Sequence, residues 1–291
     1  MVSINRLTTE KRAQIIAALV EGNSIRATVR MTGAAKNTVT KLLVDLGAAC
    51  AAYQDEVLRD LPCKVVECDE IWAYCYAKQK NVPDEFEGTF GYGDVWTWTA
   101  IDADTKLVPS WLVGERTTDD CHVFMRDLKS RLANRIQLST DGHSTYWTAI
   151  GLVFGRDVDW VIIEKQYDKA ESGKSAQSRY SPAVCTGVKV KERRGNPDPA
   201  RISTSYVERQ NLTMRMGMRH FTRLTNGFSK KVENLAHAVS LHYMHYNFVR
   251  IHASLTITHE DGSTEKRTPA MAAGVADHVW TLREIAVLLD L

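Results

Sequence analysis

The sequence lacks three features that would place it in common classes of protein. No apolar run of its 291 residues approaches the roughly 18 residues that a membrane helix needs. The first six residues, MVSINR, lack the apolar core of a secretory signal. The six cysteines include no C-x-x-C pair, so neither a disulfide framework nor a zinc ribbon is indicated. We therefore expect a cytoplasmic protein with no membrane contact.

Net charge is also small, but the charge is segregated along the chain. The formal net charge is +2. Residues 61–164 hold 10 basic and 17 acidic side chains, whereas residues 165–231 hold 15 basic and 5 acidic ones. A basic block of this size can bind phosphates by releasing their counterions. The alternative is an ordinary solvated surface.

Residues 1–50 predict a small helical domain. Three helices are expected, from Thr8 or Thr9 to about Glu21, over 25–31, and over 35–46, with a tight turn at Gly33. This is a helix-turn-helix pattern; a plain three-helix bundle is the alternative. Side chains suited to phosphates and base edges lie near the start of the third helix: Lys36, Asn37, Thr38, Thr40 and Lys41. Residues 51–62 predict a helical connector.

Residues 63–255 predict a second, α/β domain. Strands are expected over 65–72, 95–101, 107–113, 136–141 and 158–163, with helices over 118–133 and 144–154. Three antiparallel strands followed by alternating helices and strands predict a ribonuclease H-like mixed sheet flanked by helices. Residues 165–202 are polar and interrupted by Gly and Pro, which indicates a long insertion or mobile loop. Two helices follow, one from Ser203 or Ser205 and one over 229–248, and residues 256–291 form a C-terminal extension.

Three acids occupy unusual places in this domain. Asp69 interrupts an apolar strand, Asp141 ends another, and Glu208 lies on the helix within the basic block. An ionised carboxylate in a sheet is costly unless a cation meets it. Carboxylates on rigid elements suit Mg²⁺, and two such ions can promote an in-line displacement at phosphorus. The pattern predicts catalytic metal ligands at these three positions.

Glu70 competes with Asp69 for the role of first ligand. Adjacent strand residues face opposite sides of a sheet, so only one of the two is expected to join Asp141. His143 follows Asp141 and could touch a phosphate or position a water, although a hydrogen-bonded structural role is the simpler alternative.

Other acids and histidines offer rival ligands. Glu164 and Glu192 compete with Glu208, but the first directly follows a predicted strand and the second lies in the predicted insertion. Acids at 102 and 104 fall in a predicted hairpin turn, where local hydrogen bonding explains them. Histidines at 242 and 245 lie three residues apart on a helix, but no third zinc ligand accompanies them.

The residues around the three acids carry a family resemblance. They are CDEIW at 68–72, STDGHSTY at 139–146 and YVERQN at 206–211, followed by a YN-x-x-R-x-H segment at 246–252. Together they resemble the DDE transposases of bacterial insertion sequences, most closely the insertion-sequence-one type. The similarity covers roughly residues 63–255.

The resemblance implies a function, a cofactor and partners. It implies divalent-metal-dependent cleavage of transposon ends and strand transfer into target DNA, with two Mg²⁺ or Mn²⁺ ions, a homo-oligomer on double-stranded DNA, and association with the nucleoid. Arg215 stands where such transposases often carry a basic residue that contacts the transposon end. An integrase or nuclease of the same fold, or a domesticated non-catalytic DNA-binding regulator, is the alternative. The candidate DNA contacts in and after the basic block are Arg193, Arg194, Arg209, Arg215, Arg250 and His252.

Overall fold

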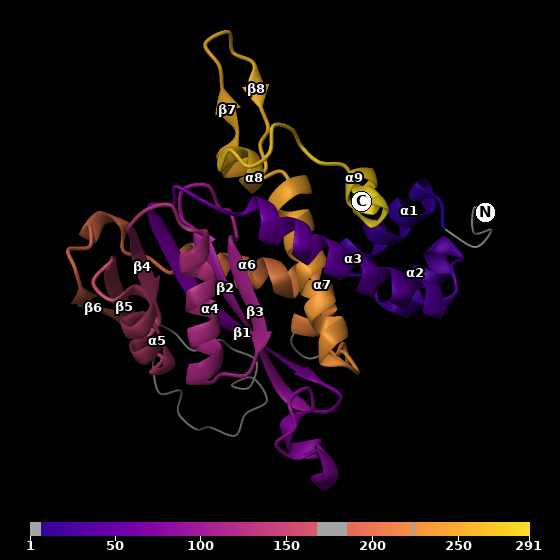
Figure 1. The fold of residues 1–291 in the computed structure, drawn as a ribbon, viewed down its shortest axis with the longest axis horizontal. Coiled ribbons are helices and arrows are strands. Elements are labelled where there is room, and N and C mark those ends of the chain that lie inside the picture. Colours follow the sequence, from indigo (N-terminus) through magenta and orange to yellow (C-terminus); the bar gives the residue numbers. More distant parts are fainter. Residues whose placement is uncertain (1–6, 168–184, 223–224) are drawn as a thin grey trace.

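A mixed six-stranded sheet forms the centre of the molecule (Figure 1). The computed structural model describes residues 7–167, 185–222 and 225–291. The strand order is β3-β2-β1-β4-β5-β6, in which β1 runs antiparallel to β2 and parallel to β4. This sheet confirms the predicted α/β class, a mixed sheet flanked by helices, and is compatible with a ribonuclease H-like fold. The N-terminal helix-turn-helix stays a prediction. The strands are β1 (Val65–Cys75), β2 (Gly93–Asp102), β3 (Ser110–Gly114), β4 (Ile136–Thr140), β5 (Val158–Tyr167) and β6 (Cys185–Arg194).

Helices pack on both faces of the sheet because side chains alternate along β1. Cys68 belongs to an apolar cluster that includes Phe124 of α4 (Thr118–Arg131) and Ile150 of α5 (Thr145–Phe154). Ile71 belongs to a second cluster with residues of α6 (Ser205–Gly217) and α7 (Val232–Met244). The positions of Asp69 and Glu70 on β1 therefore decide which pair of helices each carboxylate meets.

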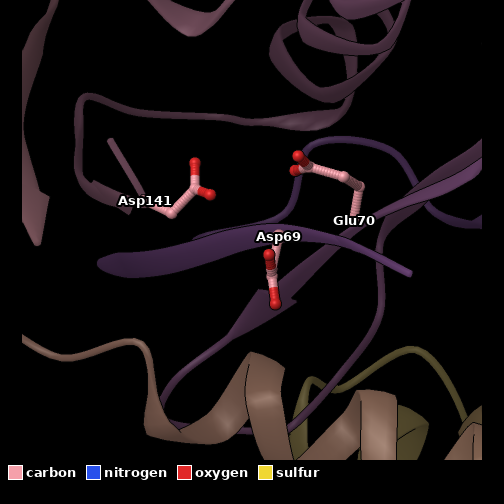
Figure 2. A group of neighbouring side chains, drawn as sticks. All are labelled: Asp69, Glu70 and Asp141. Atoms are coloured by element: carbon pink, nitrogen blue, oxygen red, sulfur yellow. The ribbon is translucent and has the colours of Figure 1, made fainter. Parts of the chain in front are cut away.

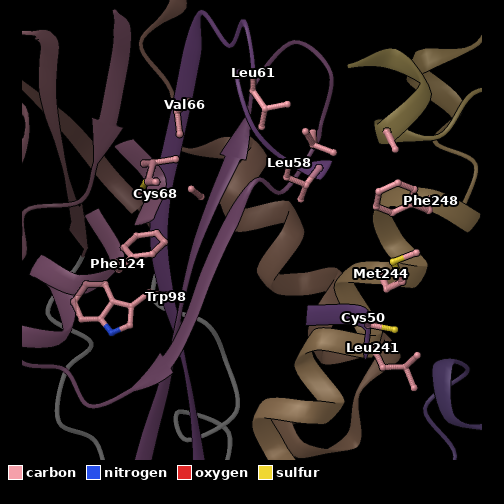
Figure 3. Packing of buried hydrophobic residues seen from close by; sticks show 14 of the residues in the cluster. Cys50, Leu58, Leu61, Val66, Cys68, Trp98, Phe124, Leu241, Met244 and Phe248 are labelled. Atoms are coloured by element: carbon pink, nitrogen blue, oxygen red, sulfur yellow. The ribbon is translucent and has the colours of Figure 1, made fainter. Parts of the chain in front are cut away.

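The N-terminal helices share the larger apolar core with the sheet (Figure 3). They are α1 (Thr9–Val20), α2 (Ile25–Thr32) and α3 (Lys36–Val57). The third helix was expected to end near residue 46, but it continues to Val57 because its second half packs on α7. The Gln54 side chain donates to the Ser240 carbonyl at 3.3 Å. A Cβ on Gly47 would lie 2.4 Å from the His237 Cβ, so only glycine permits this close approach.

The C-terminal residues return to the N-terminal helices. After α7 a π-helical turn (His245–Val249) leads to a short hairpin, β7 (Ile257–Thr258) with β8 (Thr264–Glu265), then α8 (Pro269–Ala272) and α9 (Leu282–Val287). Arg12 of α1 donates to the Ala286 carbonyl of α9 at 3.1 Å and forms an ion pair with Asp290 at 3.1 Å. Within the described residues, no helix has the length and apolarity to cross a membrane.

Two predictions for the sheet were wrong in detail, one for the insertion at 165–202 and one for the start of the third strand. Part of the predicted insertion at 165–202 is sheet: β5 continues to Tyr167, and β6 pairs with it antiparallel. Most β6 side chains are exposed, so the strand shows no apolar alternation that would reveal it. The third strand begins at Ser110 rather than 107, because the Asn247 side chain bonds both the N–H and the carbonyl of Val108, each at 3.0 Å. Residues 168–184 of the predicted insertion lie outside the described residues.

Candidate metal centre

Three carboxylates meet where β1 lies beside the end of β4. Asp69, Glu70 and Asp141 each offer an oxygen, and these oxygens lie within 4.8 Å of one another (Figure 2). The register explains the meeting, because Cys68 of β1 is paired with Thr140, the last residue of β4. Asp141 follows Thr140 and so falls beside Asp69 and Glu70. Asp141 lies outside the strand, so the alternation of side chains along β4 does not fix the face of the sheet that its side chain meets.

Asp69 is a partly buried carboxylate without a basic partner among the described residues. Burial raises its pKa to about 7, and the charges of Glu70, Asp141 and, more weakly, Glu208 add to the rise. The Asn211 side chain of α6 donates to its Oδ2 at 2.8 Å. The ionised form is thus disfavoured by its surroundings, and a bound cation would relieve that cost.

Glu70 points away from Asp69, toward the other side of β1 (Figure 2). Its side chain has no exposed area, and Arg116 forms an ion pair with it. The Tyr146 hydroxyl donates to its second oxygen at 3.1 Å. Burial and the charge of Asp141 raise the pKa of Glu70, and Arg116 opposes the rise. Arg116 and the Tyr146 hydroxyl therefore offset the cost of burying the Glu70 carboxylate.

The expectation that only one of the two β1 acids could approach Asp141 is wrong. Glu70 and Asp69 do face opposite sides, yet both place an oxygen near Asp141, which lies beyond the strand end. Arg116 joins the group, since its guanidinium lies 3.8 Å from Asp141 Oδ2 and 4.6 Å from the centre of the Trp96 ring.

Glu208 lies on the first turn of α6, outside the three-carboxylate cluster. It forms an ion pair with Lys165 of β5 and accepts a hydrogen bond from the Thr204 hydroxyl at 2.9 Å. Its charge nevertheless contributes to the raised pKa of Asp69. The structure therefore brings Asp69 and Asp141 together and holds Glu208 nearby, paired with a lysine.

The donor set fits a divalent cation. Carboxylate oxygens are the ligands that Mg²⁺ and Mn²⁺ prefer, and such ions are commonly held by one or two carboxylates with several waters. Asp69 and Asp141 would hold the ion. Asn211, which already bonds Asp69, has its side-chain oxygen buried without a hydrogen-bond partner. An unsatisfied oxygen beside an uncompensated carboxylate is consistent with a cation site.

The rival acids have local partners. The Asp102 carboxylate accepts from the Thr105 amide at 2.9 Å and from its hydroxyl at 2.6 Å, as its predicted turn position requires. Asp104 pairs with Arg201, and Glu164 pairs with Lys191. Glu192 is exposed on β6. These interactions account for the first three acids without a metal.

The histidines serve the structure in different ways. The His143 amide donates to Asp141 Oδ1 at 2.9 Å, and its ring Nδ1 lies 2.8 Å from the Thr145 hydroxyl. Burial, with a smaller effect of Arg116, lowers its pKa, which favours the neutral ring. Burial lowers the pKa of His242 to about 3. Neither His242 nor His245 belongs to the metal-ligand cluster found among the described residues.

The candidate DNA contacts of the third helix lie at the start of α3. Lys36, Asn37 and Lys41 are exposed, whereas Thr38 and Thr40 are half-buried. Some are engaged within the helix: the Thr40 hydroxyl donates to the Lys36 carbonyl at 3.1 Å, and Lys41 pairs with Asp45.

The later basic residues divide between two places. On β6, the Arg193 guanidinium lies 3.8 Å from the centre of the Trp147 ring, and Arg194 donates to the Gly155 carbonyl. Arg209 and Arg250 are exposed, whereas Arg215 and His252 are half-buried. Burial lowers the pKa of His252, and the charges of Lys106, Arg250 and Arg209 lower it further. Lys106 and Arg209 lie near the start of α6, where the Lys106 ammonium is 3.6 Å from the centre of the Tyr206 ring. Their charges and that of Arg250 act on His252.

Asn211 and Arg116 contact the carboxylates of the site but were given no role from the sequence. Asn211 carried a usable signal, because it follows Glu208 by about one helical turn. Arg116 gave none, because it lies 46 residues from Glu70 in a loop after β3.

No model of a known protein family matches this chain. No curated protein shows significant sequence similarity to it.

Proposed function

We propose that this protein is a DDE transposase, which binds the ends of a mobile element and catalyses divalent-metal-dependent DNA strand cleavage and strand transfer. The observation that carries the proposal is the partly buried, uncompensated Asp69, held beside Asp141 on one side and bonded to the helix of Glu208 on the other. The ribonuclease H-compatible sheet and the resemblance around the three acids support it. Acting on DNA would place the protein at the nucleoid.

The site residues have distinct tasks in this reaction. Two Mg²⁺ or Mn²⁺ ions would supply Lewis acidity for an attacking water or 3′ hydroxyl and for the leaving oxygen. Asp69 and Asp141 would hold a cation in their ionised forms. Glu208, which pairs with Lys165, would be the protein ligand for the second ion. Arg116 and Tyr146 hold Glu70 in place, and Glu70 in turn keeps Arg116 close to Asp141.

Two surfaces are proposed to bind DNA. The start of α3, with Lys36 and Asn37 exposed, would read the element's end as a recognition helix does. Arg209, Arg250 and His252 would bind phosphates near the start of α6, together with Lys106. Arg215, and Arg193 with Arg194 on β6, would extend this contact. Cleaving and joining two ends requires at least two copies of the chain, so a homo-oligomer on DNA is part of the proposal.

The test is cleavage by variants of the three acids. Asp69→Ala, Asp141→Ala and Glu208→Ala should each reduce Mg²⁺-dependent cleavage on the order of 10²–10³-fold or more, because each removes a ligand of the ions that would stabilise charge on the reacting phosphate. The substrate is duplex DNA taken from both sides of the gene, where a mobile element would carry inverted repeats. DNA affinity, measured by gel shift, should stay within about threefold, since binding depends mainly on cation–phosphate contacts.

The rival acids supply matched controls. Glu164→Ala and Glu192→Ala remove nearby carboxylates and should leave cleavage intact. Full cleavage by any of the three site variants would remove that residue from the ligand set. Hydrolysis without joined products would favour the nuclease alternative, and DNA binding by a wild-type protein that never cleaves would favour the regulator.

A further inference from the structure

Glu67 is a buried acid on β1 that the proposed chemistry does not use. It precedes Asp69 by two residues and therefore faces the same side of the strand. Its exposed area is 0%. One carboxylate oxygen, Oε2, accepts hydrogen bonds from the backbone amides of Tyr206 at 2.8 Å and Val207 at 3.0 Å. These amides belong to the first turn of α6, the helix that carries Glu208.

The start of α6 needs such a partner. The first amides of a helix have no partner within the helix, and a carboxylate there also interacts favourably with the helix dipole. Thr204, the residue at the cap position, makes no side-chain hydrogen bond to them. Glu67 supplies the missing acceptor from a strand 139 residues earlier in the chain. A buried carboxylate is costly at a sheet–helix interface, so this bond fixes a specific placement of the helix.

A second contact joins the same helix to the same strand. Asn211 donates to Asp69 at 2.8 Å, one turn after Glu208. Glu67 thus holds α6 just before Glu208, and Asn211 holds it just after. Two contacts on one strand fix both the position of the helix along β1 and its rotation. Without the first, the helix could turn Glu208 and Asn211 away from Asp69.

We propose that Glu67 is a positioning residue for the metal site: by binding the first amides of α6 it holds Glu208 and Asn211 opposite Asp69. The inference rests on the proposed function only in that it assumes a cation bound at Asp69. Glu67 itself is not assigned as a ligand, because it lies outside the cluster of Asp69, Glu70 and Asp141 found among the described residues. Its Oε2 is occupied by the α6 amides, and its Oε1 is buried without a hydrogen-bond partner.

Binding of Mn²⁺ to the full-length protein without DNA tests this role, with free Mn²⁺ followed by electron paramagnetic resonance. Glu67→Ala should weaken Mn²⁺ affinity about tenfold, the usual size for loss of a residue that orients ligands. Glu67→Gln keeps an oxygen that can accept from both amides and should stay within about threefold of wild type. Glu67→Asp keeps the charge but shortens the reach, and should resemble Glu67→Ala.

Asp102→Ala is the matched control for general destabilisation, because Asp102 is also a buried carboxylate that accepts two hydrogen bonds. It should lower the melting temperature as Glu67→Ala does and leave Mn²⁺ affinity unchanged. A loss of affinity in Glu67→Gln as large as that in Glu67→Ala would overturn the proposal, because the charge of Glu67 rather than its acceptor oxygen would then be needed. Unchanged affinity in Glu67→Asp would also overturn it. If wild type and Asp69→Ala bind Mn²⁺ equally, the proposed metal centre fails instead.

Discussion

Two adjacent carboxylates on opposite faces of β1, those of Glu70 and Asp69, have different burial and different partners. On the face covered by α4 and α5, Glu70 is fully buried but has Arg116 and the Tyr146 hydroxyl as partners. On the face covered by α6, Asp69 is less buried but has only the neutral Asn211 amide as a side-chain partner among the described residues. The strand is the same, and the two acids are adjacent.

The difference separates an acid that stabilises the fold from one that is available to a ligand. A buried carboxylate with a cation and a hydroxyl has its desolvation cost offset, so removing it leaves Arg116 without its main partner. A carboxylate surrounded by other acids destabilises the metal-free protein. Glu70 therefore stabilises the fold, whereas Asp69 is available to bind a cation in the proposed metal site.

Isosteric amide variants of the two acids should show the largest difference in stability. Glu70→Gln should lower the free energy of unfolding by about 2 kcal/mol, because it leaves Arg116 facing a neutral group. Asp69→Asn should raise it by about 2 kcal/mol at pH 8 without metal, because it removes a disfavoured charge. Urea unfolding in a chelator measures both. Added Mg²⁺ should stabilise wild type and Glu70→Gln but not Asp69→Asn; loss of stability in both variants would refute the distinction.

The pH dependence of stability should distinguish Asp69 from a carboxylate with an ordinary pKa. Its pKa rises from an ordinary 3.8 in the unfolded chain to about 7 in the folded protein. Between these values unfolding releases a proton, so the metal-free protein should lose stability as pH rises from about 4 to 7, by at most ~1.4 kcal/mol per pH unit, and then level off. The stability of Asp69→Asn minus that of wild type isolates this group, because other titrations cancel.

That difference should widen from pH 5 through pH 7 and level off near pH 8. Saturating Mg²⁺ should suppress it by favouring the ionised form. A difference independent of pH would show that the Asp69 carboxylate has an ordinary pKa and an adequate partner.

The sequence predicted the elements that carry the acids better than the partners of the acids. Asp69 and Asp141 could be found because each charge ends or interrupts a strand-forming apolar run. The meeting of these two residues follows from parallel strand pairing. The Glu70 partner Arg116 could not be predicted, since it depends on how the loop after β3 packs across the sheet. The hydrogen bonds from the Tyr206 amide to Glu67 and from Asn211 to Asp69 likewise depend on where α6 packs against the sheet.

The strand β6 could not be predicted from the sequence for a different reason. Its side chains are mostly exposed, and Val188 and Val190 are 55% and 49% exposed, so burial does not shape its sequence. Pairing with β5 alone makes it a strand. An edge strand whose side chains face solvent leaves no alternating pattern to detect.

The smallest expected effect comes from the hydroxyl of Tyr146. Tyr146→Phe removes the hydrogen bond to Glu70 but keeps the Arg116 ion pair, and should cost about 1 kcal/mol in urea unfolding. Tyr243→Phe is its counterpart on the other face, where the hydroxyl lies 2.7 Å from the Thr99 hydroxyl, and should cost a similar amount. Mg²⁺ affinity should change in neither. A weakened Mg²⁺ affinity in Tyr146→Phe alone would mean that Glu70 takes part in binding the cation, and the division between the two faces of β1 would have to be abandoned.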